Sequence, residues 1–157
     1  MKYFLPIIFL AILVYVVYPY VDLFRLDRAL MADDQSELNA LIDLPSVKAA
    51  RKESIESQVR KTTEGAGMMS KPLQEGARRM SGAAVDAMID MNWVRDTLRW
   101  RKSDHSDTYP SIISEMSYAF FESPVKFLIR IGDLGQHPVH VRLTLKDWKW
   151  RVTAIYD

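Results

Sequence analysis

The distribution of hydrophobic and polar residues changes twice along the chain. Residues 3–21 form nineteen consecutive positions without a formal charge. In residues 22–101 apolar side chains recur every three or four positions, which is the spacing of helices with one buried face. In residues 116–154 apolar and polar side chains alternate, which is typical of strands with one buried face. We therefore expect one apolar helix, then several amphipathic helices, then a sheet.

The apolar segment is long enough to cross a membrane. Nineteen helical residues extend about 28 Å at 1.5 Å per residue, close to the ~30 Å hydrocarbon core of a bilayer. The tyrosines of this segment cluster towards its ends, where an aromatic ring with a polar tip suits the membrane interface. Pro6 falls in the first turn, and Pro19 is expected to mark the exit. The helix that carries Leu23, Leu26 and Leu30 is expected to continue directly from the span, with a bend near Pro19. These features predict a transmembrane anchor at residues 1–21 and a folded domain at residues 22–157.

A cleaved signal peptide and a buried core helix are the alternatives to an anchor. A signal peptide has a shorter apolar region and a cleavage site of small residues, whereas this segment ends in Tyr18-Pro19-Tyr20-Val21-Asp22. A core helix needs apolar segments that enclose it, and no other segment of the chain is apolar enough. We therefore expect the helix to be retained as an anchor.

The orientation of the anchor is not decided by charge alone. Lys2 and the terminal amine on one side are balanced by Arg25 and Arg28 on the other. A two-residue tail in the cytoplasm with the remainder exported is the usual arrangement of a signal anchor. We therefore expect a single-pass protein of the bacterial inner membrane with its C-terminal domain in the periplasm.

Capping residues mark the starts of the amphipathic helices. Asp34, followed by Glu37 three positions later, has the spacing of a capping box. Ser46 is expected to cap the next helix, whose charged face is either solvated or in contact with lipid headgroups. Asn92 is expected to cap a short helix over residues 93–101.

Turn residues divide the last third of the chain into four strands. Turns are expected at residues 122–124, 132–135 and 146–147. The last strand is expected to place four side chains on one side, namely Trp148, Trp150, Val152 and Ala154. The pattern predicts the α+β class: one N-terminal transmembrane helix, then three or four helices packed on a four-stranded antiparallel sheet.

Composition and charge exclude several functions. Lysine and arginine number 21 and aspartate and glutamate 20, and this net charge of +1 argues against a nucleic-acid partner. The chain has no cysteine, which excludes disulfides and thiolate chemistry.

His137 and His140 straddle a turn, where their spacing does not place them on one face, so no metal site is expected. The stretch Asp104-His105-Ser106-Asp107 contains the residue types of a hydrolase triad, but a triad is built across space rather than from neighbours in a loop. We therefore expect no catalytic residue and no cofactor, and predict that the protein is not an enzyme.

Two segments are candidate contact surfaces for a partner. The first is a helical stripe of leucines, and the second is a basic and aromatic stretch at residues 93–102, in which core packing of the tryptophans is the alternative. The residues expected to make the contacts are Leu23, Leu26, Leu30, Trp93, Arg99 and Trp100. The expected partners are the lipid bilayer and a membrane protein, and the sequence leaves open whether a small-molecule ligand binds.

Several stretches resemble a known bacterial family. They are the Tyr18-Pro19-Tyr20 end of the anchor, residues 25–30, residues 32–34, Leu38, residues 41–45, Val47, and the C-terminal stretches at residues 141–145 and 148–155. The sequence resembles the family catalogued as domain of unknown function 2939. The resemblance implies a membrane-anchored envelope protein with no established activity. The order of elements is also similar to cystatin and NTF2-like domains, in which helices sit in the concavity of a curved sheet.

Two functions are compatible with these features. The first is a non-enzymatic, membrane-anchored envelope protein that acts as an interaction or accessory module of a membrane protein complex. The second is a small-ligand binder or enzyme with an NTF2-like pocket between sheet and helices. Such a pocket needs polar groups in an apolar cavity, and Tyr118, Arg130 and Arg142 are the candidates to line it.

Overall fold

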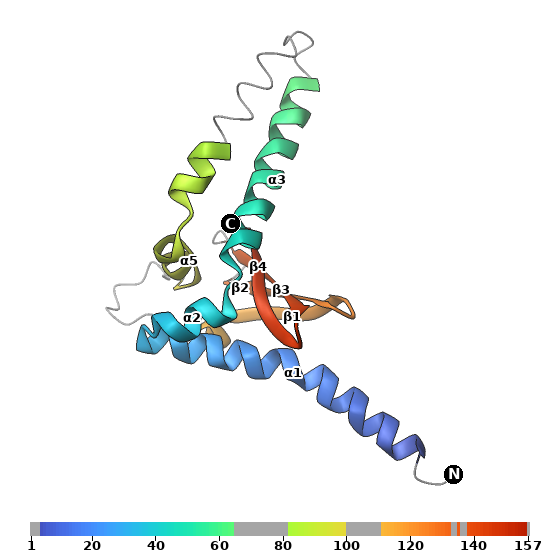
Figure 1. Cartoon of the computed structure of the whole chain (residues 1–157). Helices are drawn as coiled ribbons and strands as arrows, with labels where there is room; N and C mark the ends of the chain where they lie inside the picture. The colour runs from blue at the N-terminus through green and yellow to red at the C-terminus, as the bar shows by residue number, and fades with distance from the viewer. Residues whose placement is uncertain (1–3, 65–81, 100–110, 133–134, 136–137, 157) are drawn as a thin grey trace.

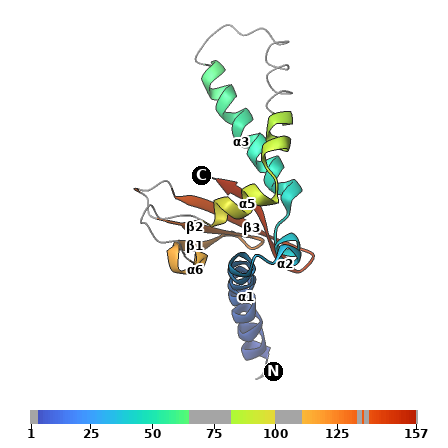
Figure 2. The same cartoon turned by 90° about the vertical axis from the view of Figure 1, so that its left-hand side faces the viewer.

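The computed structural model describes residues 4–64, 82–99, 111–132, 135 and 138–156. Helices form most of the first two thirds of the described chain (Figure 1). They are α1 (Phe4–Ala32), α2 (Gln35–Leu41), α3 (Leu44–Glu64), a helical stretch at residues 82–88, α5 (Met91–Leu98) and α6 (Ile112–Glu115). In both views, α3 and residues 82–88 rise side by side away from the sheet (Figures 1 and 2).

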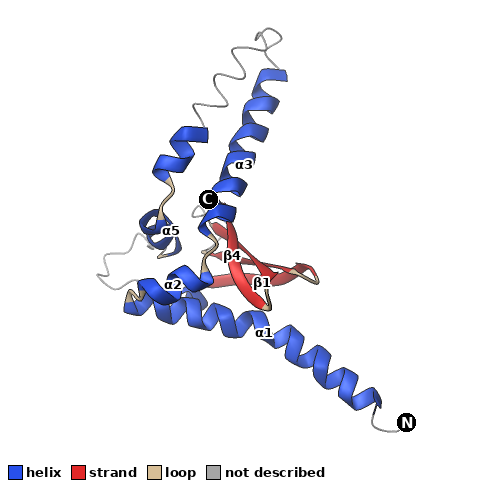
Figure 3. Cartoon of the chain, in the orientation of Figure 1, coloured by secondary structure: helices blue, strands red, loops and turns tan. Residues whose placement is uncertain are grey.

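The strands follow the helices and form one antiparallel sheet (Figure 3). They are β1 (Met116–Ser123), β2 (Lys126–Ile131), β3 (Val139–Lys146) and β4 (Lys149–Tyr156), in the spatial order β1-β2-β3-β4. Each strand pairs with the next one along the chain, because short turns join antiparallel neighbours. The predicted α+β class, with an apolar N-terminal helix and a four-stranded antiparallel sheet, is confirmed.

One face of the sheet carries the core. Phe127, Leu143 and Val152 lie in register across β2, β3 and β4, and each is at most 1% exposed. They belong to a single buried cluster with apolar side chains from α1, α2, α5 and residues 82–89. Period-two alternation places Arg130 and Arg142 on the opposite, partly exposed face. The helices therefore complete a core on one side of the sheet only.

Helix α1 is continuous from the apolar segment into the domain. It runs past residue 21 to Ala32 and contains Pro19 in its interior, so this proline does not end the helix. A proline inside a helix removes one backbone hydrogen bond and favours a bend. Figure 1 shows α1 bending along its length, with its N-terminal half projecting away from the other elements.

Aspartates cap three of the helices. The Asp34 carboxylate accepts hydrogen bonds from the backbone N–H groups of Ser36 and Glu37, which confirms the predicted cap of α2. Helix α3 begins at Leu44 rather than after Ser46, and Asp43 accepts the N–H of Ser46 at 3.1 Å.

The cap predicted at Asn92 is also too late, by two residues. Helix α5 begins at Met91, and the Asp90 carboxylate accepts the N–H of Trp93 at 2.7 Å. In each case a carboxylate just outside the helix reaches the free N–H groups of the first turn, so the predicted cap residue lies inside the helix.

The β3–β4 hairpin differs from its prediction at both ends of β4. Asp147 and Trp148 form the turn with φ angles of 49° and 59°, so Trp148 does not lie in the strand. Farther along, a bulge between Arg142 and Leu143 shifts the pairing with β4. Because a bulge adds one residue to a strand, Ile155 rather than Ala154 joins the core cluster beyond it.

Candidate functional site: the junction between the apolar helix and the domain

Exposure along α1 divides the helix into two parts. Every side chain from Leu5 to Val14 is exposed, with 80% of Leu5 and 59% of Val14 accessible. Beginning at Tyr15, one stripe of the helix packs against the domain at helical spacing. Its partly or fully buried members are Tyr15, Tyr18, Pro19, Asp22, Leu23, Leu26, Asp27, Ala29 and Leu30. The apolar segment therefore ends inside the fold rather than at its border.

Aromatic side chains join α1 to the sheet at the start of this stripe. The Tyr15 ring stacks on Phe121, with ring centroids 6.1 Å apart, and lies 6.4 Å from the Trp150 ring. The Tyr18 hydroxyl donates a hydrogen bond of 2.5 Å to the carbonyl oxygen of Trp148 in the β3–β4 turn. These contacts fix the end of the sheet beside residues 15–18 of α1.

A buried carboxylate continues the junction one turn farther along α1. Asp22 is 2% exposed and accepts the backbone N–H of Trp150 at 3.0 Å. It also forms an ion pair of 3.2 Å with the Arg25 guanidinium. The same guanidinium binds the Glu37 carboxylate on α2 at 2.6 Å. The hydrogen bond to Glu37 raises the pKa of Arg25 above its ordinary value. Asp22 is therefore buried with partners that satisfy its oxygens, as a buried charge requires.

A second buried carboxylate, Asp27, holds the segment that leads into the sheet. Its two oxygens accept the backbone N–H of Ile112 at 2.7 Å and the hydroxyl of Ser111 at 2.8 Å. Both donors lie in the first turn of α6 or at its cap. Helix α1 therefore supplies a second acceptor for the first turn of α6, beside the Ser111 cap, across 85 residues of sequence.

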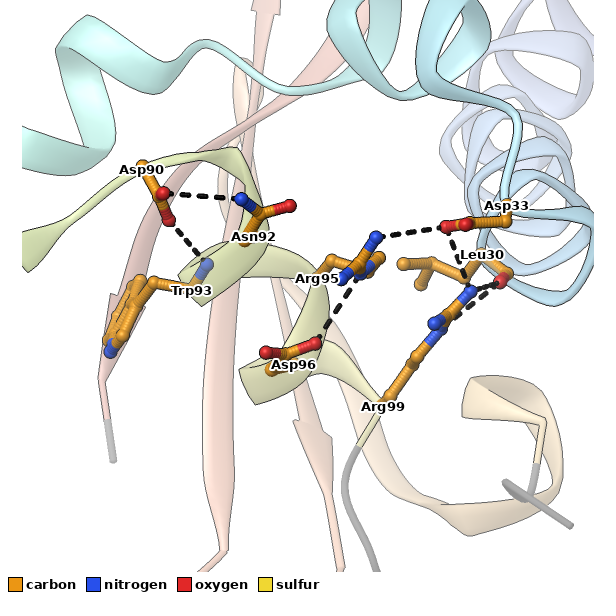
Figure 4. Close-up of polar contacts among 8 residues, drawn as sticks. All are labelled: Leu30, Asp33, Asp90, Asn92, Trp93, Arg95, Asp96 and Arg99. Atoms are coloured by element: carbon orange, nitrogen blue, oxygen red, sulfur yellow. Dashed lines mark hydrogen bonds and ion pairs between the residues drawn. The ribbon is translucent and has the colours of Figure 1, made fainter.

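Two arginines, Arg95 on α5 and Arg99 at its C-cap, bind the C-terminal end of α1 (Figure 4). Arg99 donates to the carbonyl of Leu30 from two of its nitrogens, at 2.5 and 3.2 Å, and binds Asp33 at 3.2 Å. Arg95 binds the same Asp33 oxygen at 3.2 Å. A cation at this position satisfies a free carbonyl and complements the negative end of the helix dipole. Both ends of the packed part of α1 are thus tied to other elements.

The residues predicted to form contact surfaces occupy different environments. Leu23, Leu26 and Leu30 are 1–3% exposed within the core of this chain, so they do not present a surface to a partner. Arg99 is bound to the end of α1, and Trp93 packs partly buried against the core. Trp100 lies outside the described residues. The structure thus uses the predicted surface mainly for internal packing.

Of the polar residues considered for a metal site or a hydrolase triad, His140 alone lies in the ranges that the structure describes. In the described ranges no three His, Asp or Glu side chains lie together as a metal-binding group. His140 is partly buried on β3, whereas His105, His137 and the rest of residues 104–107 lie outside those ranges.

The candidates to line a pocket face away from the core. Arg130 lies over the Tyr118 ring, 5.5 Å from its centroid, and Tyr118 is 46% exposed. Arg142 binds Glu122 at 2.6 Å and the Tyr156 hydroxyl at 2.9 Å, and the hydrogen bond to Glu122 raises the pKa of Arg142. The three side chains therefore form surface pairs on the side of the sheet opposite the helices.

Sequence reasoning missed the residues that build the junction. Asp22 and Asp27 carried a signal, because each lies four positions from a buried leucine and therefore on the buried stripe of α1. The contact of Tyr18 with Trp148 carried none, because its partners are separated by 130 residues.

Comparison with known proteins identifies a family and no activity. Residues 8–97, more than half of the chain, match the sequence profile of a family described as "Protein of unknown function (DUF2939)". No curated protein and no solved structure matches the chain. The match covers most of α1, including the junction residues on it, together with α2, α3 and most of α5.

Proposed function

The chain belongs to the DUF2939 family of proteins of unknown function, and we propose that it is a single-pass, membrane-anchored envelope protein whose domain acts as an interaction module. In this proposal the domain lies in the periplasm of a bacterium and serves as an accessory part of a membrane protein complex. The observation that carries the proposal is the packing of Tyr15 and Tyr18 against the sheet.

That packing favours a retained anchor over a cleaved signal. Helix α1 is long and apolar enough to span a membrane, and a signal sequence would meet the same description. Cleavage after Tyr20 would, however, remove the Tyr15 ring, which packs against Phe121 and Trp150, and the Tyr18 hydroxyl, which donates to the Trp148 carbonyl. A segment that completes the core of the mature domain is expected to stay attached to it.

The role as an interaction module is supported by how the buried charges are used. Asp22, Asp27 and Arg99 each bind backbone groups of another element and hold that element on α1. Such side chains stabilise a rigid frame, and a rigid frame attached to a membrane helix suits an accessory subunit. The alternative of an NTF2-like pocket has less support, because Tyr118, Arg130 and Arg142 pair on the exposed face of the sheet.

The anchor is tested by expressing the full chain in a bacterium and washing the membranes with alkaline carbonate. We expect an intact chain of 157 residues that stays in the pellet, as judged by mass spectrometry. A matched control carries Leu10→Arg and Val14→Arg at two exposed positions of α1. Each arginine makes insertion of the helix into the membrane less favourable by about 2.5–3.5 kcal/mol. The control should leave the membrane pellet. A soluble native chain that starts downstream of Tyr20 would overturn the proposal.

Orientation and partners need separate measurements. Because the chain has no cysteine, Asn39→Cys on the exposed surface of α2 introduces a unique label site. A maleimide that cannot cross the inner membrane should label this site in cells with a permeable outer membrane, and labelling only after lysis would place the domain in the cytoplasm.

Purification in mild detergent should recover a stable membrane-protein partner. Repeated recovery of an isolated monomer would count against the accessory role.

A further inference from the structure

The turn between β3 and β4 carries an aromatic residue that the fold itself does not use. Trp148 is 81% exposed, although tryptophan is one of the residues that gain most from burial. It has a φ of 59° and follows Asp147 at 49°, a pair of left-handed conformations that ordinarily favours asparagine and glycine in hairpin turns. A bulky side chain at such a position calls for an explanation outside the core.

The position of this turn is fixed relative to the apolar helix. The Tyr18 hydroxyl holds the Trp148 carbonyl at 2.5 Å. Tyr18 precedes Val21, the last residue of the uncharged segment, by three positions, which is about 4.5 Å along a helix axis. If residues 3–21 span the bilayer, as the proposed function holds, the turn lies at the depth of the lipid headgroups.

The neighbouring turn lies at the same end of the sheet. The backbone N–H of Leu145 donates to the carbonyl of Val125 at 2.9 Å, which joins the β1–β2 and β3–β4 turns. Figure 1 shows this end of the sheet on the side of the N-terminal half of α1. Val125 is 46% exposed, so a second apolar side chain lies beside the tryptophan turn.

The charges around these turns are mainly positive. Lys126, Lys146 and Lys149 are exposed there together with two carboxylates, those of Asp147 and of Glu122, and Glu122 is neutralised by its ion pair with Arg142. Lys146 binds Asp43 at 2.6 Å, whereas Lys126 and Lys149 form no ion pair with another described residue. Exposed lysines beside an indole ring are the combination that binds anionic headgroups while the ring enters the interface.

We propose that Trp148, flanked by Val125, Lys126 and Lys149, inserts into the headgroup region of an anionic bilayer beside α1. The occupant of this surface is the lipid in which the helix is anchored, because the surface is continuous with the apolar segment through Tyr18. The domain is then held at two points, by α1 and by the turns, and cannot rotate freely about its anchor. This inference rests on the proposed function, since it needs α1 in the membrane.

Depth measurements on the full chain test this docking. Single cysteines are introduced at Trp148 and, in a second variant that keeps the tryptophan, at Lys149, and each is labelled with an environment-sensitive fluorophore. The chain is reconstituted in vesicles of phosphatidylethanolamine and phosphatidylglycerol that carry a nitroxide on the headgroup or deep in the acyl chain. Ile12→Cys reports on the anchor, and Asn39→Cys on α2 is the exposed control.

We expect headgroup nitroxides to quench about half or more of the fluorescence at positions 148 and 149, and deep nitroxides to quench position 12. The control at Asn39 should lose little. Full exposure to water at both turn positions, with position 12 quenched, would overturn the docking and leave the anchor intact. Loss of quenching at position 12 as well would overturn the proposed anchor. Protection of the turns without quenching by lipid would mean that a protein or a second copy covers them, and would also overturn the inference.

The contribution of the lysines is measured in the same vesicles. Lys126→Glu combined with Lys149→Glu keeps Trp148 and its turn but reverses two charges. We expect this variant, labelled through Val125→Cys, to be quenched at least about twofold less by anionic headgroups than the Val125→Cys chain with both lysines. Equal quenching of the two would remove the lysines from the proposal.

Discussion

The carboxylate of Asp22 accepts the backbone N–H of Trp150 at 3.0 Å, across 128 residues of sequence. This bond joins α1, which carries the apolar segment, to β4. Strand β4 lies at one edge of the sheet and packs against α3. Both groups are buried, so the bond is made where water cannot replace it. The stability of the domain should therefore depend on a residue next to the predicted membrane boundary.

Replacing Asp22 by alanine tests this dependence. The substitution leaves the N–H of Trp150 buried without an acceptor, which costs about 1–3 kcal/mol. We expect the free energy of unfolding of Asp22→Ala to fall by about that amount, as measured by urea denaturation in detergent micelles. Asp22→Asn keeps a side-chain oxygen as acceptor and should lose less. Equal losses for the two variants would contradict the role of the acceptor.

Asp27 allows an independent measurement on the other buried carboxylate of α1. Asp27→Ala removes the acceptor for the N–H of Ile112 and the hydroxyl of Ser111, and so removes part of the cap of α6. Loss of a cap typically costs about 1–2 kcal/mol, and we expect this decrease in the free energy of unfolding. Asp96→Ala is the matched control, because this aspartate is 69% exposed on α5 and its loss should change stability by about 0.5 kcal/mol or less. Similar losses for the two variants would argue against the cap.

The strand region could be predicted because its evidence is local. Alternation with period two identifies the buried side chains of β2 and β3, and the turns follow from glycine, proline and polar residues. The prediction is wrong beyond the bulge at Arg142 and Leu143, where Ile155 joins the core cluster and Ala154, although buried, does not. A bulge depends on how two strands fit together, and one strand alone does not contain that information.

The junction could not be predicted in the same way. The helical stripe of α1 placed Leu23 and Leu26 on one face, but the sequence did not indicate whether that face meets a partner or the chain's own sheet. Burial of Asp22 and Asp27 depends on donors more than 80 residues away, at Trp150 and Ile112. Residues this far apart in sequence leave no periodic pattern that would bring them together.

Arg99 is expected to hold α5 on the end of α1. Arg99→Ala removes two hydrogen bonds to the Leu30 carbonyl and one ion pair with Asp33. We expect the backbone amides of α5 to exchange with deuterium several-fold faster, because local opening then costs less free energy. Arg28→Ala, at an exposed position of α1, is the matched control and should leave this exchange unchanged. Unchanged protection of α5 in Arg99→Ala would show that apolar packing and the Arg95–Asp33 ion pair hold the helix without Arg99.

Asp43 links helix α3 to the sheet and should make stability depend on pH. Its carboxylate accepts bonds from the Lys146 ammonium at 2.6 Å and from the hydroxyl and N–H of Ser46 at 2.9 and 3.1 Å. Burial acts to raise the pKa of Asp43, but these hydrogen bonds together outweigh it and lower the pKa below its ordinary value. A lowered pKa in the folded state means that the folded chain binds the proton less readily than the unfolded chain.

The stabilisation by Asp43 is therefore complete above the pKa of an unfolded aspartate, about 3.9, and is lost as the pH falls through the lower pKa of the folded state. Asp43→Asn lacks the titrating group, so the difference in free energy of unfolding between the native chain and this variant isolates its effect. We expect this difference to be constant between about pH 7 and pH 5 and to shrink below about pH 4, as measured by urea denaturation across that range. Other carboxylates lose their own contributions in acid, but they do so in both proteins and cancel in the difference. A difference that stays constant down to about pH 3 would mean that the ionised form of Asp43 does not stabilise the link between α3 and the sheet.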